Sequence, residues 1–209
     1  MKILVTAATD GELRHIVEND AVTRLTTGIG IVATAYSLGK IQLQKYNLVL
    51  NVGIAGSFST KLKIGDVAVV ESEAFGDFGI LSDKGFTSCF DEGLLAPNSP
   101  PFSHGLLFSE NAAKIAEQLS LPTVKGLTNN AVSGEKNRIR FMREKFSADI
   151  ETMESAAFFY VLLSENMNFA AFRAISNMVE PRNKNNWNIP LAVKNLSNRV
   201  NTYINSILC

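Results

Sequence analysis

Short apolar runs alternate along the chain with longer segments whose apolar residues recur every three or four positions. The apolar runs predict buried strands at 2–7, 22–26, 46–52, 66–73, 123–127 and 169–175. The periodic segments predict helices at 31–45, 109–119, 135–145, 155–165 and 190–208. A further helix is expected from Asp10, with Leu13, Ile16 and Val17 on its inner face. Strands that alternate with helices favour an α/β fold whose mainly parallel sheet is covered on both faces.

The stretch between Gly76 and Gly105 interrupts this alternation. It contains several prolines and glycines and no sustained periodicity. Connections of this length are uncommon in compact domains and often serve as lids or binding loops. Phe75, Phe78 and Phe86 suit a hydrophobic lid, a subunit contact or ordinary core packing, and the role of the stretch stays open. Because the sequence contains no linker and no repeat, we expect a single domain over residues 1–209.

Composition and charge narrow the function classes. Twenty Lys and Arg residues balance twenty Asp and Glu residues, so the formal net charge is zero. A neutral chain lacks the excess positive charge typical of proteins that bind nucleic acid. No apolar run in the sequence is long enough to span a bilayer, so a membrane partner is not expected either. Two cysteines, Cys89 and Cys209, do not make a disulfide framework, and the apolar start is too short for a signal peptide, so we expect a cytoplasmic protein. His15 and His104 are isolated, so neither a metal nor another cofactor is expected.

Polar residues follow three of the apolar runs. Ligands of open α/β sheets bind beyond the carboxyl ends of the strands, so the segments after Ala7, Val52 and Ile175 are expected to lie together. Glu12 belongs to the first of these segments. On position alone, a carboxylate in the first turn of a helix more commonly complements the helix dipole than it serves catalysis.

Two other segments carry candidate chemistry. Glu154 stands at the head of an apolar helix, where it is either a helix cap or a bidentate acceptor for the two hydroxyls of a ribose. Arg173, Ser176 and Asn177 lie within five positions of one another at the end of a buried strand. They form either a binding site or an ordinary polar turn.

Seven segments together resemble the nucleoside phosphorylase/nucleosidase superfamily, and within it the methylthioadenosine/adenosylhomocysteine nucleosidase branch. They lie in family order and span the chain: 8–12, 27–30, 51–56, 62–67, 132–134, 151–157 and 172–177. Each segment is weak alone, because short glycine motifs are widespread, but the ordered set is specific. The resemblance implies a nucleoside phosphorylase-like, three-layer αβα sandwich with a mixed, mainly parallel central sheet. It also implies an enzyme that hydrolyses N-glycosyl bonds without a cofactor.

The resemblance implies a role for each matched residue. Glu12 would be the general base that takes a proton from the attacking water, and Glu154 would hold the 2′ and 3′ hydroxyls of the substrate. Met153 would pack beneath the sugar, while Arg173 and Ser176 would orient the groups around them. Relatives of this kind form homodimers or higher homo-oligomers, which is the expected assembly. The remaining matches would line the sugar and base pocket: Ile29, Ile54, Ala55, Gly56, Trp187 and, facing the purine, Asn177.

The glycine-rich segments favour water over phosphate as the nucleophile. Phosphorylases of this superfamily resemble one another in placing arginines beside these segments, and arginine forks suit phosphate. Neither 27–30 nor 51–57 contains an arginine, although Arg24 lies just upstream of the first. A carboxylate at Glu12 would also repel a phosphate. The sequence therefore indicates a hydrolase.

Asn177 departs from the adenine-cleaving nucleosidases, which resemble one another in having aspartate at this position. An asparagine cannot supply a proton, but its amide can donate to N7 or O6 of a 6-oxopurine and accept from N7–H. Asn177, the run 179–183 and Trp187 together resemble the futalosine hydrolases. Those enzymes release hypoxanthine from futalosine, leaving dehypoxanthine futalosine, during menaquinone biosynthesis. The resemblance implies the same reaction for this chain.

Futalosine carries a carboxylate, so the resemblance also implies a cation to meet it. Arg182, Lys184 and Arg138 are candidates that cannot be ranked, and a solvated surface charge is the more common explanation for any one of them. The stretch from Lys136 to Arg138 replaces an apolar and aromatic stretch of the adenine-cleaving enzymes. Base contacts from that stretch cannot be transferred.

Three other functions stay open on the sequence. The chain is compatible with an adenine-releasing nucleosidase whose base site is altered, and with a phosphorylase. It is also compatible with a catalytically inactive nucleoside-binding protein, because a fold does not fix a function. The presence of both Glu12 and Glu154 argues against an inactive protein.

Overall fold

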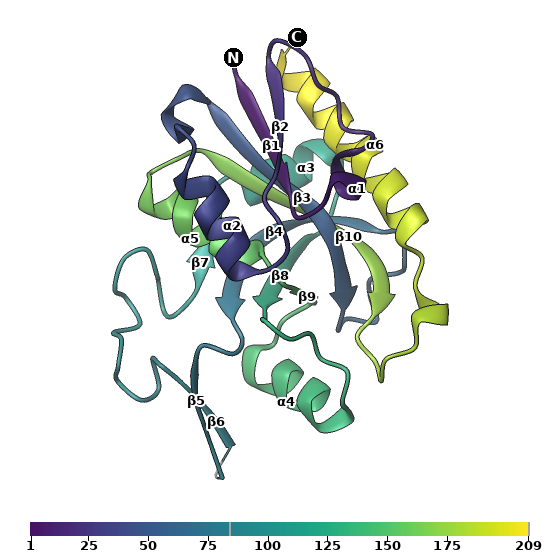
Figure 1. Ribbon diagram of the computed structural model, residues 1–209. Coiled ribbons are helices and arrows are strands. Elements are labelled where there is room, and N and C mark those ends of the chain that lie inside the picture. Colours follow the sequence, from purple (N-terminus) through teal and green to yellow (C-terminus); the bar gives the residue numbers. More distant parts are fainter. Residues whose placement is uncertain (84, 209) are drawn as a thin grey trace.

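The computed structural model describes residues 1–83 and 85–208 (Figure 1). Its strands are β1 Ile3–Ala7, β2 Val22–Thr26, β3 Leu48–Ser57, β4 Val67–Phe75, β5 Gly79–Ser82, β6 Gly85–Ser88, β7 Leu107–Phe108, β8 Thr123–Thr128, β9 Ile150–Thr152 and β10 Phe169–Met178. Its α-helices are α1 Asp10–Leu13, α2 Ile31–Gly39, α3 Ala112–Leu119, α4 Lys136–Phe146, α5 Ser155–Ser164 and α6 Ile189–Leu208. Short 3-10 helices lie at Leu43–Lys45 and Lys184–Asn186.

The main sheet is mixed and closes partly on itself. Its strands run in the order β10-β4-β8-β9-β3-β1-β2, and β10 also pairs with β3, so a ring forms from which β1 and β2 extend. Strand β10 closes the ring because it pairs in parallel with β3 and antiparallel with β4. Its register against β3 shifts between Ile175 and Asn177, and such bulges increase local twist. The expected mixed α/β sheet is therefore present, but it is not the flat central layer of a sandwich.

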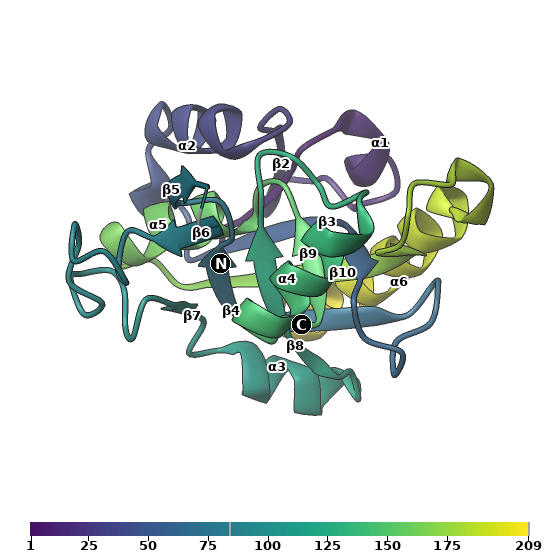
Figure 2. The ribbon, with the colours of Figure 1, turned by 90° about the horizontal axis from the view of Figure 1, so that it is seen from below.

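Helices cover both faces of the sheet (Figure 2). Helices α1, α3 and α6 pack over one apolar cluster, which includes Leu50 and Phe172. Helices α2 and α5 pack over a second cluster, in which the rings of Phe159 and Phe169 lie 4.9 Å apart. Full burial of one such side chain stabilises the fold by about 1.5–3 kcal/mol. These two cores fix the strand ends that carry the candidate chemistry.

Helix α1 is shorter than its hydrophobic pattern predicts. It ends at Leu13, and the guanidinium of Arg24 donates to the carbonyl oxygens of Leu13 at 3.1 Å and Ile16 at 3.5 Å. The backbone nitrogen of Val17 donates to Asn201 on α6 at 3.0 Å instead of to a helical carbonyl. Long-range polar contacts thus replace the helical hydrogen bonds. Ile16 is still buried, as its apolar character predicts.

Strands β3 and β10 are longer than predicted. Residues 53–56, expected to form a turn, continue β3 to Ser57. Ser176 and Asn177, expected just beyond a strand, lie within β10. Helix α2 ends at Gly39 instead of reaching residue 45, and a 3-10 turn follows. Polar and glycine residues here line a site from within the sheet, so they do not mark the ends of strands.

The stretch between Gly76 and Gly105 contains the hairpin of β5 and β6, which the sequence pattern did not predict. The hairpin projects from the body of the molecule (Figure 1). Phe75 and Phe78 lie 6.0 Å apart in an aromatic cluster, and Phe86 lies 6.1 Å from Phe141 of α4. Phe75 is partly buried against the second apolar cluster, whereas Phe78 is 41% exposed, so core packing does not account for all three phenylalanines.

Among the described residues, no helix is long and apolar enough to cross a membrane. Cys89 is a half-buried free thiol. Cys209, the other cysteine of the sequence, lies outside the described residues.

Candidate active site

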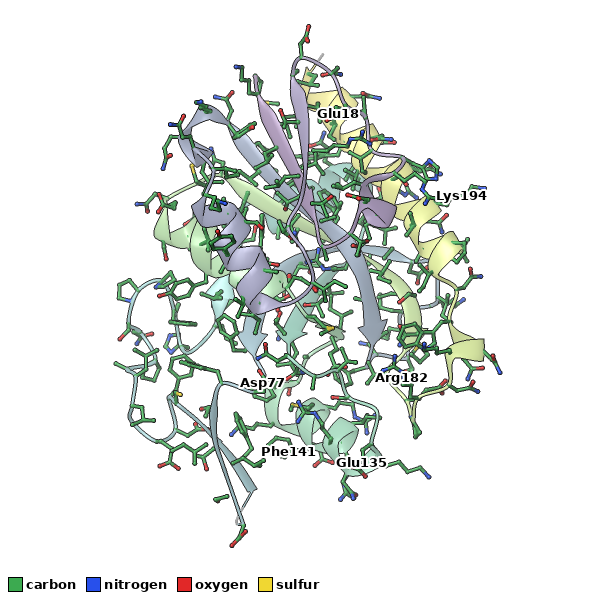
Figure 3. The ribbon with its side chains drawn as sticks, in the orientation of Figure 1. Glu18, Asp77, Glu135, Phe141, Arg182 and Lys194 are labelled. Carbon is green, nitrogen blue, oxygen red and sulfur yellow. The ribbon has the colours of Figure 1, made fainter. Side chains whose placement is uncertain are left out.

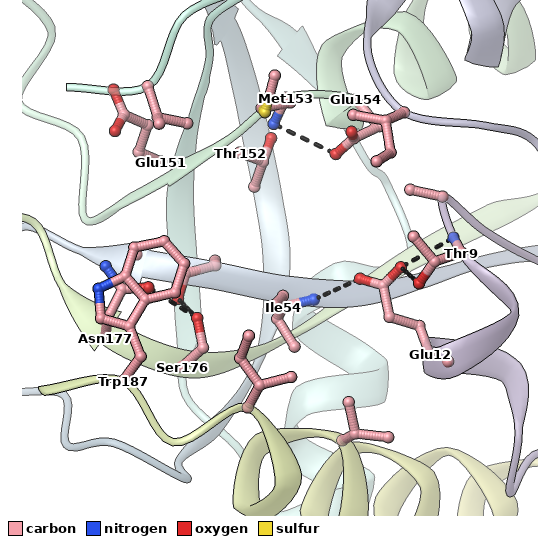
Figure 4. Close-up of a pocket in the computed structure, with 18 of the residues that line it drawn as sticks. Thr9, Glu12, Ile54, Glu151, Thr152, Met153, Glu154, Ser176, Asn177 and Trp187 are labelled. Atoms are coloured by element: carbon pink, nitrogen blue, oxygen red, sulfur yellow. Dashed lines mark hydrogen bonds between the residues drawn. The ribbon is translucent and has the colours of Figure 1, made fainter. Parts of the chain in front are cut away.

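A cavity of about 950 Å³ opens beside the ends of β1, β3, β9 and β10 (Figure 4). Its walls come from these strands, from α1, from the start of α6 and from the segment before it. The volume lies near the upper end of the range for small-molecule sites, about 300–1,000 Å³. The segments after Ala7, Val52 and Ile175, which we expected to gather, all contribute to it.

The cavity brings together all but one of the residues that the sequence predicted for the site. They are Glu12, Ile29, Ile54, Ala55, Gly56, Met153, Glu154, Ser176, Asn177 and Trp187. Arg173 is the exception, because it does not line the cavity. These residues come from both halves of the chain, and the parallel pairing of β1 and β10 with β3 aligns their strand ends.

Glu12 is held in place by donors on two elements. Its Oε2 atom accepts hydrogen bonds from the backbone nitrogen of Thr9 at 3.0 Å and from the Thr9 hydroxyl at 2.8 Å. Its Oε1 atom accepts from the backbone nitrogen of Ile54 at 3.0 Å. Thr9, rather than Asp10, is the N-cap of α1. Glu12 therefore makes the helix-start contacts of an ordinary capping residue, and it also reaches β3 across the cavity floor.

Gly53 makes room for this carboxylate. A Cβ atom at position 53 would lie 3.1 Å from Oε1 of Glu12 and 3.7 Å from Cζ of Arg173. The backbone of β3 thus passes directly beneath Glu12, with Arg173 beside it. A side chain at this position would push the carboxylate away from Ile54.

Glu154 precedes α5 and turns its carboxylate into the cavity. Its Oε1 atom accepts from the backbone nitrogen of Gly30 at 2.9 Å, and Oε2 accepts from that of Met153 at 3.3 Å. Burial raises the pKa of Glu154, against the opposing effects of the Gly30 hydrogen bond and the charge of Arg173. Glu154 thus links the glycine turn before α2 to the opposite wall of the cavity.

Asn177 lies at the bulge of β10. Its Oδ1 atom accepts from the hydroxyl of Ser176 at 2.7 Å, and its Nδ2 atom donates to the carbonyl of Met178 at 2.9 Å. Ser176 is itself anchored to the carbonyl of Ala55 at 3.3 Å. The bulge lets consecutive residues, Ser176 and Asn177, both line the cavity, although strand residues normally alternate.

Arg173 was predicted among the substrate-binding residues, but the structure buries it behind the cavity. Its Nη1 atom donates to the carbonyls of Phe172 at 2.8 Å and Asn51 at 3.3 Å, and its Nη2 atom donates to Oδ1 of Asn51. Asn51 in turn donates to the hydroxyl of Thr6 at 3.0 Å. Arg173 therefore ties β10 to β3 and, through Asn51, to β1 from behind the cavity.

Glu73 is a buried carboxyl group that the sequence reading missed. It is 0% exposed on β4, and its Oε2 atom accepts from the hydroxyl of Thr128 at 3.0 Å. Burial raises the pKa of Glu73 to about 7, although Ser155, Arg173 and Thr128 all oppose the shift. Burial also lowers the pKa of Arg173, while the charges of Glu73, Glu154 and Glu12 oppose that change. The carboxyl groups of Glu12, Glu73 and Glu154 thus all interact electrostatically with the buried guanidinium of Arg173.

Glu151 and Ser133 also line the cavity and were not assigned a role from the sequence, although both lie in segments that carry the resemblance. The two oxygens of Glu151 accept from the backbone nitrogen of Ser133 at 2.8 Å, from its hydroxyl at 2.7 Å and from Nδ2 of Asn129 at 2.8 Å. All donors of this set point at one buried carboxylate. Glu151 lies on β9 and Asn177 on β10, and both pair with Gly56 of β3, so the set fixes the wall on the other side of β3 from Asn177 (Figure 4).

The cations proposed for a substrate carboxylate have different positions. Arg182 lines the cavity with its guanidinium carbon 5.7 Å from the ring centre of Trp187. Lys184 does not line the cavity, and neither does Arg138, whose Nη2 atom donates to the carbonyl of Ala131. Three lining residues with basic side chains were not predicted for this role: Arg14, His15 and Lys194.

Arg24 is occupied away from the cavity. It forms a salt bridge with Glu18 and donates to the carbonyl oxygens of Leu13, the last residue of α1, and of Ile16 beyond it. It therefore does not provide the arginine fork that a phosphate nucleophile would need. Within the described residues, no three His, Cys, Asp or Glu side chains gather as ligands for a metal ion.

Known protein families and curated relatives resemble this chain over most of its length. The family model described as the phosphorylase superfamily matches residues 3–205. Futalosine hydrolase of Thermus thermophilus is 29% identical over 180 residues, which cover 84% of this chain and 78% of that protein. The 5′-methylthioadenosine/S-adenosylhomocysteine nucleosidase of Haemophilus influenzae is 28% identical over 161 residues, which cover 75% of this chain and 68% of that protein.

Solved structures share the fold. Futalosine hydrolase of Helicobacter pylori superposes with a TM-score of 0.82 at 17% identity, over 98% of this chain and 97% of that one. The 5′-methylthioadenosine/S-adenosylhomocysteine nucleosidase of Colwellia psychrerythraea, solved with adenine, has a TM-score of 0.81 at 18% identity, over 98% of this chain and 95% of that one. At these identities the likeness concerns the fold.

Proposed function

The chain belongs to the phosphorylase superfamily, and from this premise we propose that it is a purine nucleosidase formed by one domain over residues 1–209. The observation that carries the proposal is the shared cavity of Glu12, Glu154 and Asn177. The chemistry of an N-glycosidic cleavage needs a base for water, an acceptor for the ribose hydroxyls and a donor for the leaving purine. The three side chains supply these functions in that order.

Glu12 acts as the general base. Its carboxylate takes a proton from water, the water oxygen bonds to C1′, and the bond from C1′ to the purine nitrogen breaks with its electron pair staying on the base. The purine is then protonated from solvent. Because Thr9 and Ile54 fix both oxygens of Glu12, the carboxylate needs little reorganisation when positive charge develops on the ribose.

Glu154 holds the sugar. Two carboxylate oxygens match the spacing of vicinal hydroxyls, and each hydroxyl donates one hydrogen bond. The pKa of Glu154 is raised by burial, and hydroxyl donors from the ribose would stabilise its charged form. Met153 packs beneath the sugar ring, while Ile29, Ile54 and Trp187 supply apolar contacts. Arg173 and Ser176 keep Glu12 and Asn177 in position.

Asn177 selects the base, and on this ground we assign futalosine as the substrate and hypoxanthine as the product. Its amide donates to N7 or O6 of the departing 6-oxopurine and accepts from N7–H, but unlike an aspartic acid it cannot supply a proton to a leaving adenine. The 29% identity to a futalosine hydrolase supports this substrate. The 28% identity to an adenine-releasing nucleosidase supports the second candidate, hydrolysis of methylthioadenosine or adenosylhomocysteine.

The nucleophile is tested by the phosphate dependence of base release. Purified protein is incubated with futalosine in phosphate-free buffer and again with added phosphate, and the sugar product is identified by mass spectrometry. Equal rates with a free sugar product support hydrolysis. A strict need for phosphate, with a sugar 1-phosphate as product, would establish a phosphorylase instead. Binding without turnover in either buffer would leave a nucleoside-binding protein.

The same proposal includes a cytoplasmic homodimer or higher homo-oligomer. An apolar stripe on and before α2 supports it, since Ile29 is 64%, Val32 78% and Tyr36 64% exposed. Exposed apolar patches of this kind commonly mark interfaces. Sedimentation velocity on the wild type and on Val32→Lys tests the assembly. A smaller species for Val32→Lys supports it, and a monomeric wild type contradicts it.

A further inference from the structure

One wall of the cavity is cationic, and the mechanism above does not use it. Arg14 at the end of α1 and Lys194 on α6 both line the cavity, with His15 beside them. Lys194 lies on the body of α6, whereas Arg182 lies on the loop that precedes this helix (Figure 3). The two cations therefore belong to a wall distinct from the stacked pair of Arg182 and Trp187.

Over residues 1–83 and 85–208, the cations of this wall form no salt bridge with the acidic residues nearest in sequence. Asp10 accepts a hydrogen bond from Thr26, and Glu18 forms its salt bridge with Arg24. Neither Arg14 nor Lys194 takes part in a salt bridge within the described part of the chain. Cations that line a cavity without a partner favour an anionic ligand there.

The wall is held together by side chains of its own. Asn201 on α6 accepts from the backbone nitrogen of Val17 at 3.0 Å and donates to the carbonyl of His15 at 2.8 Å. The segment that follows Arg14 is therefore fixed to the helix that carries Lys194. Both cations are presented on one fixed surface and not on separate mobile loops.

The position of the wall determines which part of a nucleoside reaches it. In Figure 4, α6 runs along the side of the cavity opposite Met153 and Glu154, and Asn177 lies at one end. With the ribose hydroxyls on Glu154 and the base at Asn177, the 5′ carbon points away from Glu154 toward α6. Apolar residues of α6, Pro190 and Val193, line the path, and the cavity has room for a substituent beyond the ribose.

We propose that Arg14 and Lys194 form a binding site for a carboxylate carried at the end of the substrate's 5′ substituent. The proposal rests on the proposed function for the orientation of the nucleoside. It names the cations that receive the acidic arm of the substrate, in place of Lys184 and Arg138. Charged hydrogen bonds of this type are among the stronger ones, and Arg14 can make two in parallel.

The test compares substrates with and without the anion. Values of kcat/KM are measured for futalosine against inosine, and for S-adenosylhomocysteine against methylthioadenosine, with wild type, Arg14→Gln and Lys194→Gln. Lys184→Gln is the matched control, because Lys184 is exposed and does not line the cavity. We expect each cavity variant to lose about tenfold in kcat/KM, or ~1.4 kcal/mol, on carboxylate substrates only.

Equal losses on charged and uncharged substrates, or no loss on either, would overturn the carboxylate site. Circular dichroism of each variant checks that it is folded. If the wild type cleaves none of the four nucleosides, the proposed function fails. The carboxylate site is then still tested by calorimetric titration of the same proteins with futalosine and with inosine. The carboxylate site is supported if the cavity variants bind futalosine more weakly than the wild type does while their binding of inosine is unchanged. It is rejected if their binding of futalosine is unchanged.

Discussion

The carboxylate of Glu12 accepts a hydrogen bond from the backbone nitrogen of Ile54 at 3.0 Å, across 42 positions of sequence. This contact joins the start of α1 to the middle of β3 at the floor of the cavity. A carboxylate that only capped a helix would not need it. The contact orients Glu12 toward the space where the sugar is proposed to lie, and its removal should affect catalysis more than folding.

Replacement of Glu12 by Gln tests the general base directly. The glutamine amide keeps the size of the side chain but cannot take a proton from water. We expect kcat to fall by about 10²–10⁴-fold, with nucleoside affinity nearly unchanged. Single-turnover base release and calorimetric titration measure the two quantities, and Glu117→Gln on the exposed face of α3 is the control. Substantial turnover by Glu12→Gln would reject the assignment.

Gly53→Ala should reduce activity without unfolding the protein. The new Cβ atom would lie 3.1 Å from Oε1 of Glu12. The carboxylate must then shift by a few tenths of an ångström, or lose its hydrogen bond from the backbone nitrogen of Ile54. Misplacement of a catalytic group on this scale reduces the rate by on the order of 10–100-fold. Gly39→Ala is the control, because a Cβ atom there meets nothing within 4 Å. An equally active Gly53→Ala would show that the position of Glu12 is not critical.

Glu73 should make folding stability depend on pH. Its folded pKa is raised from 4.5 to about 7, so the folded state keeps the proton after the unfolded state has lost it. Protonated Glu73 contributes about 3 kcal/mol to the free energy of unfolding. This contribution is fully present below pH 4.5, decreases as the pH rises, and is lost above about pH 7.

The pH effect is measured against a variant that cannot titrate. Urea unfolding of wild type and Glu73→Gln is followed between pH 4 and 8 at steps of about one unit. We expect the stability of the wild type relative to Glu73→Gln to decrease by about 3 kcal/mol over this range. A constant difference would mean that Glu73 has the same pKa in the folded and the unfolded protein, and would contradict the raised pKa. Glu117→Gln again serves as the control.

Asn177→Asp should move base selectivity toward adenine. An aspartate oxygen in place of Nδ2 would face the carbonyl of Met178 at about the 2.9 Å seen for the amide, which favours a protonated carboxyl. That carboxyl could donate a proton to a leaving adenine. We expect the ratio of hypoxanthine to adenine release, in kcat/KM, to fall at least about tenfold. An unchanged ratio would remove Asn177 from base recognition.

The sequence predicted the cavity better than the elements that surround it. Glu12, Glu154 and Asn177 could be assigned because their segments carry the family resemblance. The early end of α1 could not be predicted, because it depends on Arg24 and Asn201, which come from other elements. Ring closure also escaped prediction, since β10 pairs with two strands that are distant in sequence.

Glu73 illustrates a second limit of sequence reasoning. A glutamate in a strand ordinarily indicates a solvent-facing position. Here it is buried because its β-sheet neighbour is Gly126, where an added Cβ atom would lie 2.0 Å from Oε1 of Glu73. The missing side chain of Gly126 provides the space for the carboxyl group. Only the register of β4 and β8 reveals that these two residues are neighbours.

The most direct test of the proposed activity is to identify the base that the wild-type protein releases. Futalosine, inosine and methylthioadenosine are offered separately in phosphate-free buffer, and products are separated by chromatography. We expect hypoxanthine from futalosine, with little from inosine. Adenine from methylthioadenosine alone would keep Glu12 as the base but contradict the role given to Asn177. Release of no base from any of the three would contradict a purine nucleosidase.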